Sequence, residues 1–240
     1  MKPLNIPPES TARLREKDRP SRQRELSSMG KDYLGAVGFQ LKQAFRILKH
    51  PFDVFWDIRY RNRASLTASV VLLVLAYIVL LVSESLTAYT FNPTEAGVNP
   101  LQLLVQYGLP WLTWVMANYM IASIMKGQGR WTEVFTASSY SLMPFILLSV
   151  PAALITNVLT LSEKVVYSTA QWVMIGWTLI LFFIMVKEIH NYDIQETIVN
   201  LVVTVLFMIA VWVLLFIVAG LTFQLYDFLT QVIREVTYRA

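Results

Sequence analysis

The 240-residue sequence is 55% hydrophobic and only 15% charged, whereas a soluble domain is about 45–50% apolar and about 25% charged. These proportions predict a protein embedded in a lipid bilayer. The sequence has no cysteine and two histidines, which excludes thiolate catalysis, thiolate zinc sites, iron–sulfur clusters and multi-histidine metal centres. We therefore expect no cofactor and no bound metal.

The first 63 residues carry most of the positive charge. Fourteen of the 20 Lys and Arg residues precede residue 64, directly before the first long apolar run. A basic segment in this position is typical of the cytoplasmic side of an anionic membrane, so we expect lipid binding and no nucleic-acid binding. Residues 1–29 are rich in proline and charge and poor in aromatic side chains. They are predicted to form a disordered basic cytoplasmic tail.

Residues 30–63 are predicted to form an amphipathic segment at the membrane interface. Apolar side chains are interspersed with Lys42, Arg46 and Lys49, the pattern of a basic amphipathic helix that ends before Pro51. Two placements of this helix are open. Its cations can contact anionic lipid headgroups while its apolar face enters the acyl boundary, or the helix can dock on the protein's own cytoplasmic loops.

Five uncharged stretches follow, each 20 to 30 residues long and rich in Leu, Ile, Val, Phe and Trp. A helix needs about 20 residues to cross about 30 Å of hydrocarbon, and it satisfies its own backbone hydrogen bonds there. The predicted fold is an all-α integral membrane protein, with a membrane domain over residues 64–225 and a short external tail over residues 226–240. The five predicted transmembrane helices cover residues 65–87, 102–125, 138–161, 167–187 and 196–223.

Ionisable residues of the kind that pumps and membrane enzymes use are nearly absent from these spans. Glu84 lies at the outer end of the first span, where a solvated carboxylate is expected. His190 follows the fourth span, where we favour a hydrogen-bonded residue that caps the helix over a metal ligand assisted by Asp193 and His50. No motif for nucleotide binding, serine hydrolysis or zinc proteolysis occurs, so we predict no catalytic residue and no enzyme activity.

Several polar residues lie at similar depth on different predicted helices, among them Asn118, Tyr140 and Asn200. They are predicted to hydrogen-bond across helices, and the alternative is a polar lining for a lipid or small solute. Pro144 and Pro151 each remove a backbone donor and predict a bend in the third helix. Whether that bend is structural or a hinge stays open.

The loop between the second and third predicted helices has a distinctive order of residues. A glycine-rich turn is followed by a Glu-Val pair that begins a short amphipathic helix, and then by a tyrosine and a proline where the next membrane helix starts. These positions are Gly127, Gly129, Glu133, Tyr140 and Pro144. In this setting the pattern resembles the Yip1 domain family, and the resemblance extends over roughly residues 50–225.

The resemblance implies a polytopic, non-enzymatic membrane protein. Eukaryotic members of the family associate with Rab GTPases and vesicle trafficking. This sequence lacks the Asp-Leu-Tyr-Gly-Pro-Phe-Trp-Ile motif of those members before its first helix, which favours a bacterial-type member in the plasma membrane.

The expected function is that of a scaffold or accessory subunit, which acts through anionic lipids and through an unidentified membrane or cytoplasmic protein. The alternative is an accessory or permease subunit of an ATP-driven transporter. Lipid contact is assigned to Lys42, Arg46 and Lys49. Protein contact is assigned to residues in or beside the two loops predicted to be cytoplasmic, near residues 126–137 and 187–195. The reason is that aromatic and Arg side chains are enriched in binding hot spots. These residues are Arg130, Trp131, Glu133, Tyr140, Pro144 and His190.

The positive-inside rule fixes an orientation that can be measured. With a cytoplasmic N-terminus and five crossings, seventeen of the 20 Lys and Arg residues lie inside and three lie outside. A reporter inserted at residue 128 should therefore be active only in the cytoplasm, and a reporter fused after Ala240 only in an external, oxidising compartment. Cytoplasmic activity of the second fusion would mean an even number of crossings.

Overall fold

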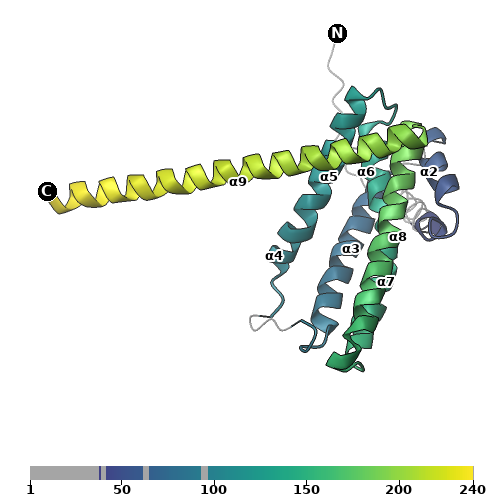
Figure 1. Cartoon of the computed structure of the whole chain (residues 1–240), viewed down its shortest axis with the longest axis horizontal. Coiled ribbons are helices and arrows are strands. Elements are labelled where there is room, and N and C mark those ends of the chain that lie inside the picture. Colours follow the sequence, from purple (N-terminus) through teal and green to yellow (C-terminus); the bar gives the residue numbers. More distant parts are fainter. Residues whose placement is uncertain (1–37, 39–41, 62–64, 93–96, 240) are drawn as a thin grey trace, which may run out of the picture.

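The computed structural model describes residues 38, 42–61, 65–92 and 97–239. Every regular element within these ranges is a helix. The predicted tail over residues 1–29 lies outside the described residues, as does most of the segment 30–41. The described chain forms a bundle of long helices, with α9 leaving it to one side (Figure 1).

The basic segment before the bundle is docked on the protein. Residues 42–46 are helical, and Ala44 and Ile47 are fully buried in the main hydrophobic core. Lys42, Arg46 and Lys49 are exposed on the other side of the segment. Ala44 and Ile47 are thus covered by the protein, whereas Phe45 is exposed. Lys42 and Lys49 are exposed, and Arg46 forms an ion pair with Asp53 (3.6 Å) while its side chain stays 47% exposed.

Helix α2 (Pro51–Tyr60) follows immediately. Pro51 occupies its first position, where the missing N–H costs nothing because that group has no intrahelical acceptor. One face of α2 buries Val54, Phe55 and Ile58 against α8 and α6. The other face leaves Phe52, Trp56 and Tyr60 about half exposed, which suits a helix lying at a membrane interface.

Among the described residues, four helical stretches are long and apolar enough to cross a membrane. The first is α3 (Leu66–Leu86). The second combines α6 (Trp131–Tyr140) with α7 (Met143–Thr156). The third combines the short η2 (Leu161–Glu163) with α8 (Lys164–His190), and the fourth lies in α9 (Ile194–Arg239). Four of the five predicted helices are therefore candidate membrane-spanning helices with little or no interruption.

The remaining predicted helix, over residues 102–125, is helical but divided. It consists of α4 (Pro100–Leu103), the π-helical turn η1 (Leu104–Gly108) and α5 (Leu109–Ile124) in direct succession. Pro110 explains the interruption, because proline has no N–H and its ring clashes with the carbonyl four residues earlier. A wider π turn accommodates that clash without ending the helix.

Two further expectations about helix limits are corrected. Pro144 does not bend a helix, since it lies in the first turn of α7, after a short break at residues 141–142. Pro151 does lie inside α7. The helix predicted to end at residue 223 continues to Arg239 as part of α9.

The loops sort to two ends of the bundle. At one end, which we call the α2 end, lie α2, the loop at residues 125–130 and the turn between α8 and α9 (Figure 1). At the opposite end the loop after α3 meets the loop after α7. There the Ala88 N–H donates to Thr156 Oγ1 (2.9 Å), and Asn157 Nδ2 donates to the Leu86 carbonyl (2.8 Å). The cytoplasmic segments predicted from the sequence are residues 1–63 and the loops near residues 126–137 and 187–195. The described part of the first segment and both loops thus share one end.

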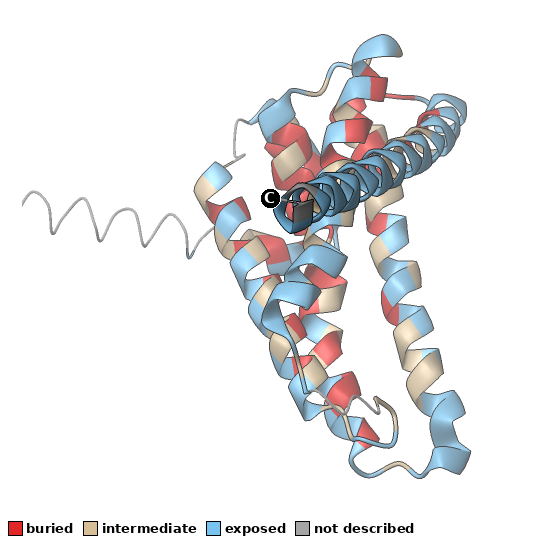
Figure 2. Cartoon of the chain, turned by 90° about the vertical axis from the view of Figure 1, so that its left-hand side faces the viewer, coloured by how far each residue is buried: buried red, intermediate tan, exposed pale blue. Residues whose placement is uncertain are grey.

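Helix α9 packs on the rest of the chain mainly through its first half. Thr197, Asn200 and Thr204 are fully buried, and Trp212 Nε1 donates to Thr113 Oγ1 of α5 (3.3 Å). Beyond that contact the helix is exposed almost throughout, as Figure 2 shows. Residues 213–226 of this part carry no charge and are mostly apolar, which suits contact with lipid, whereas charged residues recur from Asp227 onward.

Candidate functional site at the α2 end

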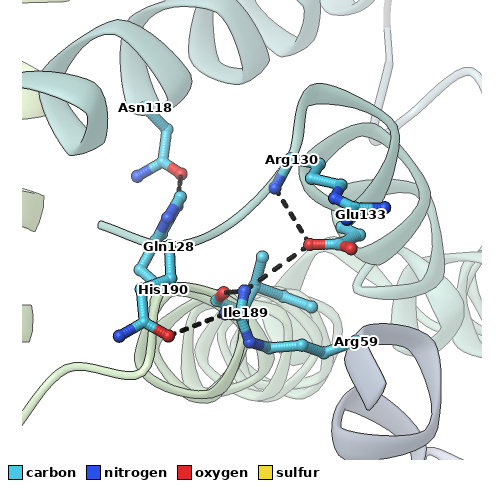
Figure 3. Close-up of polar contacts among 7 residues, drawn as sticks. All are labelled: Arg59, Asn118, Gln128, Arg130, Glu133, Ile189 and His190. Atoms are coloured by element: carbon cyan, nitrogen blue, oxygen red, sulfur yellow. Dashed lines mark hydrogen bonds and ion pairs between the residues drawn. The ribbon is translucent and has the colours of Figure 1, made fainter. Parts of the chain in front are cut away.

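A buried arginine of α2 joins four segments that are far apart in the sequence. The side chain of Arg59 is only 10% exposed. Its Nη2 donates to Gln128 Oε1 (3.0 Å) in the loop, and its Nη1 donates to the carbonyl of Ile189 in α8. The same Nη1 forms an ion pair with Glu133 Oε2 of α6 (3.5 Å; Figure 3). Arg59 therefore ties α2, the loop, α6 and the end of α8 together.

Glu133 also caps the start of α6. Its Oε2 accepts a hydrogen bond from the backbone N–H of Arg130 (2.9 Å), the residue that precedes the helix. A carboxylate at the third helical position commonly reaches back in this way, and the positive end of the helix dipole favours it there. The Glu133 side chain is 8% exposed, so both of these contacts are shielded from water.

A second buried polar chain runs through His190, the last residue of α8. His190 Nε2 lies 3.0 Å from Asn118 Oδ1 of α5, and Asn118 Nδ2 donates to Asn200 Oδ1 of α9 (2.9 Å). Because the Asn118 amide group donates to Asn200, its oxygen faces the histidine, and His190 Nε2 is therefore the donor. The three side chains are almost completely buried and link three helices.

The two glycines of the loop allow it to lie against this histidine. A Cβ atom on Gly127 would lie 2.6 Å from Tyr192 Oη and 2.9 Å from His190 Nδ1. On Gly129 it would lie 2.8 Å from both His190 Nδ1 and Ile189 Cγ2. The positive φ of this turn (60°) belongs to Lys126 instead. The glycines are thus required for close packing, and not for an unusual backbone conformation.

Tyr192 completes the packing around the loop. Its ring lies 5.4 Å from that of His190, and its hydroxyl donates to the carbonyl of Ala122 (3.3 Å). Burial, and after it the nearby Glu196 carboxylate, raises the pKa of Tyr192 above its ordinary value. The hydroxyl therefore keeps its proton and remains a donor at neutral pH.

The six residues assigned to protein contact divide into two groups. Arg130 is exposed, and Trp131 is 36% exposed with its ring 5.5 Å from that of Tyr119. The other four are buried inside the protein: Glu133, Tyr140, Pro144 and His190. Direct contact with a partner is thus open to the first pair, and that role stays a prediction.

The cross-helix contact predicted for Asn118 and Asn200 can be compared with the geometry. Asn118 and Asn200 bond to each other across helices, as expected of polar packing residues, and they are fully buried. Within the described part of the chain no group of three His, Asp or Glu residues is placed to hold a metal ion. The sequence reasoning missed Arg59. Arg59 follows Phe55 by four residues and shares its face of the helix, but only the structure shows that this face is buried.

A comparison with protein-family models matches the Yip1 domain over residues 45–217. The chain belongs to the Yip1 domain family. No curated protein and no solved structure matches it. Both buried polar networks lie entirely inside the part matched to the Yip1 domain. The loop pattern that resembled this family therefore has a structural explanation, since its glycines approach His190 and its glutamate pairs with Arg59.

The Arg59–Glu133 pair should be strongly coupled. Replacing Arg59 by methionine leaves a buried carboxylate without its cation, and we expect a loss of about 3–5 kcal/mol in unfolding free energy. Adding Glu133→Gln should recover part of that loss, because the uncompensated charge is removed. Denaturant unfolding of the purified protein in detergent measures both.

The matched control is Arg61→Met on the same helix. Arg61 pairs with Asp57 at 3.4 Å, but its side chain is 54% exposed, so we expect a loss of no more than about 1 kcal/mol. Equal losses for the two arginines would show that burial of the Arg59 pair has no energetic consequence.

Gly129→Ala tests the close approach of the loop. The added methyl group meets a buried imidazole that cannot move aside, so we expect a destabilisation of about 1–3 kcal/mol, visible as a lower midpoint of thermal unfolding. Gly176→Ala in α8 is the control. Apart from its chain neighbours and the backbone of its own helix, no atom lies within 4 Å of the corresponding Cβ position, and alanine favours the helix by up to about 1 kcal/mol. A neutral Gly129→Ala would contradict the packing argument.

Proposed function

We propose that this Yip1 family protein is a non-catalytic scaffold or accessory subunit of a bacterial plasma membrane, with the α2 end in the cytoplasm. In this proposal residues 100–124 form a fifth crossing and the C-terminus is external. A helix of this length spans about 37 Å, more than the hydrocarbon core requires. The cytoplasmic assignment is supported by charge, since Lys126, Arg130 and Lys187 lie at the same end as the basic N-terminal segment.

One observation carries the proposal. The α2 end exposes aromatic and cationic side chains on a backbone that buried polar contacts hold in place. Arg130 and Trp131 lie three and two residues before Glu133, and the Arg59–Glu133 pair holds the start of α6 in place. Rigid aromatic and arginine side chains are the usual anchors of protein interfaces, because ordering them on binding costs little.

Lipid and protein contacts are assigned to neighbouring parts of this surface. Lys42, Arg46 and Lys49 are assigned to anionic headgroups; their exposure supports this, and the ion pair of Arg46 with Asp53 is itself exposed. Arg130 and Trp131 are assigned to a cytoplasmic protein partner. Nothing in the comparisons or in the described residues favours the alternative of an ATP-driven transporter component.

The test is recovery of partners after crosslinking in cells. The double variant Arg130→Ala, Trp131→Ala should insert and fold like the wild type, because both side chains lie outside the core. It should lose at least about 80% of a specific cytoplasmic partner, as expected when two hot-spot residues worth about 1 kcal/mol or more each are truncated. Mass spectrometry of the purified complexes provides the measurement.

The matched control is Lys164→Ala, Trp172→Ala. It removes the same kinds of side chain from the part of α8 that lies toward the opposite end, where both are exposed. The proposal requires the control to keep every partner that the wild type has. If the two double variants recover the same partners in the same yield, the α2 end is not the binding surface.

A further inference from the structure

A polar pocket lies between the end of α2 and the start of α6. Its volume is about 340 Å³, and its lining consists of Arg59, Tyr60, Gln128, Arg130 and Glu133. Every one of these side chains has a polar or charged group. A pocket of this composition selects a polar ligand, because an apolar occupant would leave these groups without hydrogen-bond partners.

The pocket contains more donors than acceptors. The charges of Arg59 and Glu133 offset each other, and one carboxylate oxygen of Glu133 already accepts from the Arg130 backbone. Gln128 Oε1 accepts from Arg59, which leaves the amide N–H groups of Gln128 as donors. The guanidinium of Arg130 has no hydrogen bond or ion pair within the described part of the chain. The surplus is one positive charge and several N–H groups.

Two more features favour an anion in the same place. Arg59 is nine-tenths buried, and its Nε has no acceptor among the described residues. Helix α6, ten residues long, begins at Trp131 beside the pocket. The first N–H groups of a helix have no intrahelical acceptor and lie at the positive end of its dipole, which favours phosphate and other anions.

The surroundings indicate where the anion comes from. Phe52, Trp56 and Tyr60 form the exposed face of α2, and Tyr60 also lines the pocket. Half-exposed aromatic residues of a membrane protein concentrate at the depth of the lipid headgroups. A pocket at this depth meets phospholipid phosphates at a much higher local concentration than any soluble phosphate.

We propose that this pocket binds the phosphate group of an anionic phospholipid, held by the Arg130 guanidinium, the Gln128 amide and the first turn of α6. The site differs from the basic segment at Lys42, Arg46 and Lys49, whose attraction to lipid is diffuse. It shares Arg130 with the protein contact proposed above, but lipid binding can be tested separately because it needs only the purified chain.

The experiment uses the full-length protein carrying Lys42→Gln, Arg46→Gln and Lys49→Gln, which removes the contribution of the basic segment. Binding of dioctanoyl phosphatidylglycerol is titrated in a neutral detergent and followed by tryptophan fluorescence and by native mass spectrometry. Arg130→Gln in this background should weaken binding about tenfold or more, the usual effect of losing a charge-assisted hydrogen bond.

Lys126→Gln is the matched control, since Lys126 is an exposed cation of the same loop that does not line the pocket. It should change the dissociation constant less than twofold, and both variants should keep the wild-type unfolding midpoint. Inorganic phosphate and dioctanoylglycerol, which has no phosphate, should both bind at least about tenfold more weakly than the phospholipid. Equal effects of the two variants, equal binding of inorganic phosphate or of dioctanoylglycerol, or no saturable binding would each overturn the proposal.

Discussion

The guanidinium of Arg59 is the group on which the α2 end depends. A buried charge is tolerated only when it is paired and its hydrogen-bonding groups are largely satisfied. Arg59 meets this condition with Glu133, Gln128 and the Ile189 carbonyl, which come from three other segments. Arg59 can therefore be buried only if those segments have assembled around it. The pair gives little net stability, but it penalises any arrangement in which one of the segments is misplaced.

Polar contacts that select one arrangement of the helices matter more in a membrane than in water. Lipid tails are as apolar as leucine, so burial of apolar surface does not by itself choose among helix arrangements. The polar contacts between His190, Asn118 and Asn200 do choose, because each amide or imidazole left unpaired in hydrocarbon is costly. At the opposite end, Thr156 and Asn157 have the same role toward the end of α3. Polar contacts thus fix the helices at both ends of the bundle.

The positions of the long helices could be predicted from the sequence, because the length of an uncharged apolar run is a direct physical requirement for crossing a bilayer. Details of each helix were harder to predict. The π turn before Pro110 depends on how the backbone absorbs the proline, and periodicity carries no information about that. The extension of α9 was missed because the predicted helix was confined to the uncharged run, which ends before Asp227. A charge does not end a helix, and no proline follows in the sequence. The buried role of Arg59 required knowing which helix face is covered.

The glycine loop shows how a family pattern can report packing more than chemistry. Gly127 and Gly129 bring the backbone against the buried His190, and the buried Glu133 contacts Arg59 and the Arg130 backbone N–H through its Oε2. None of these groups is available to bind a partner directly. Their effect is to fix the backbone between residues 127 and 133, and that stretch carries the exposed Arg130 and Trp131. Recognition at the α2 end therefore rests on two surface side chains whose positions are set by buried neighbours on either side of them.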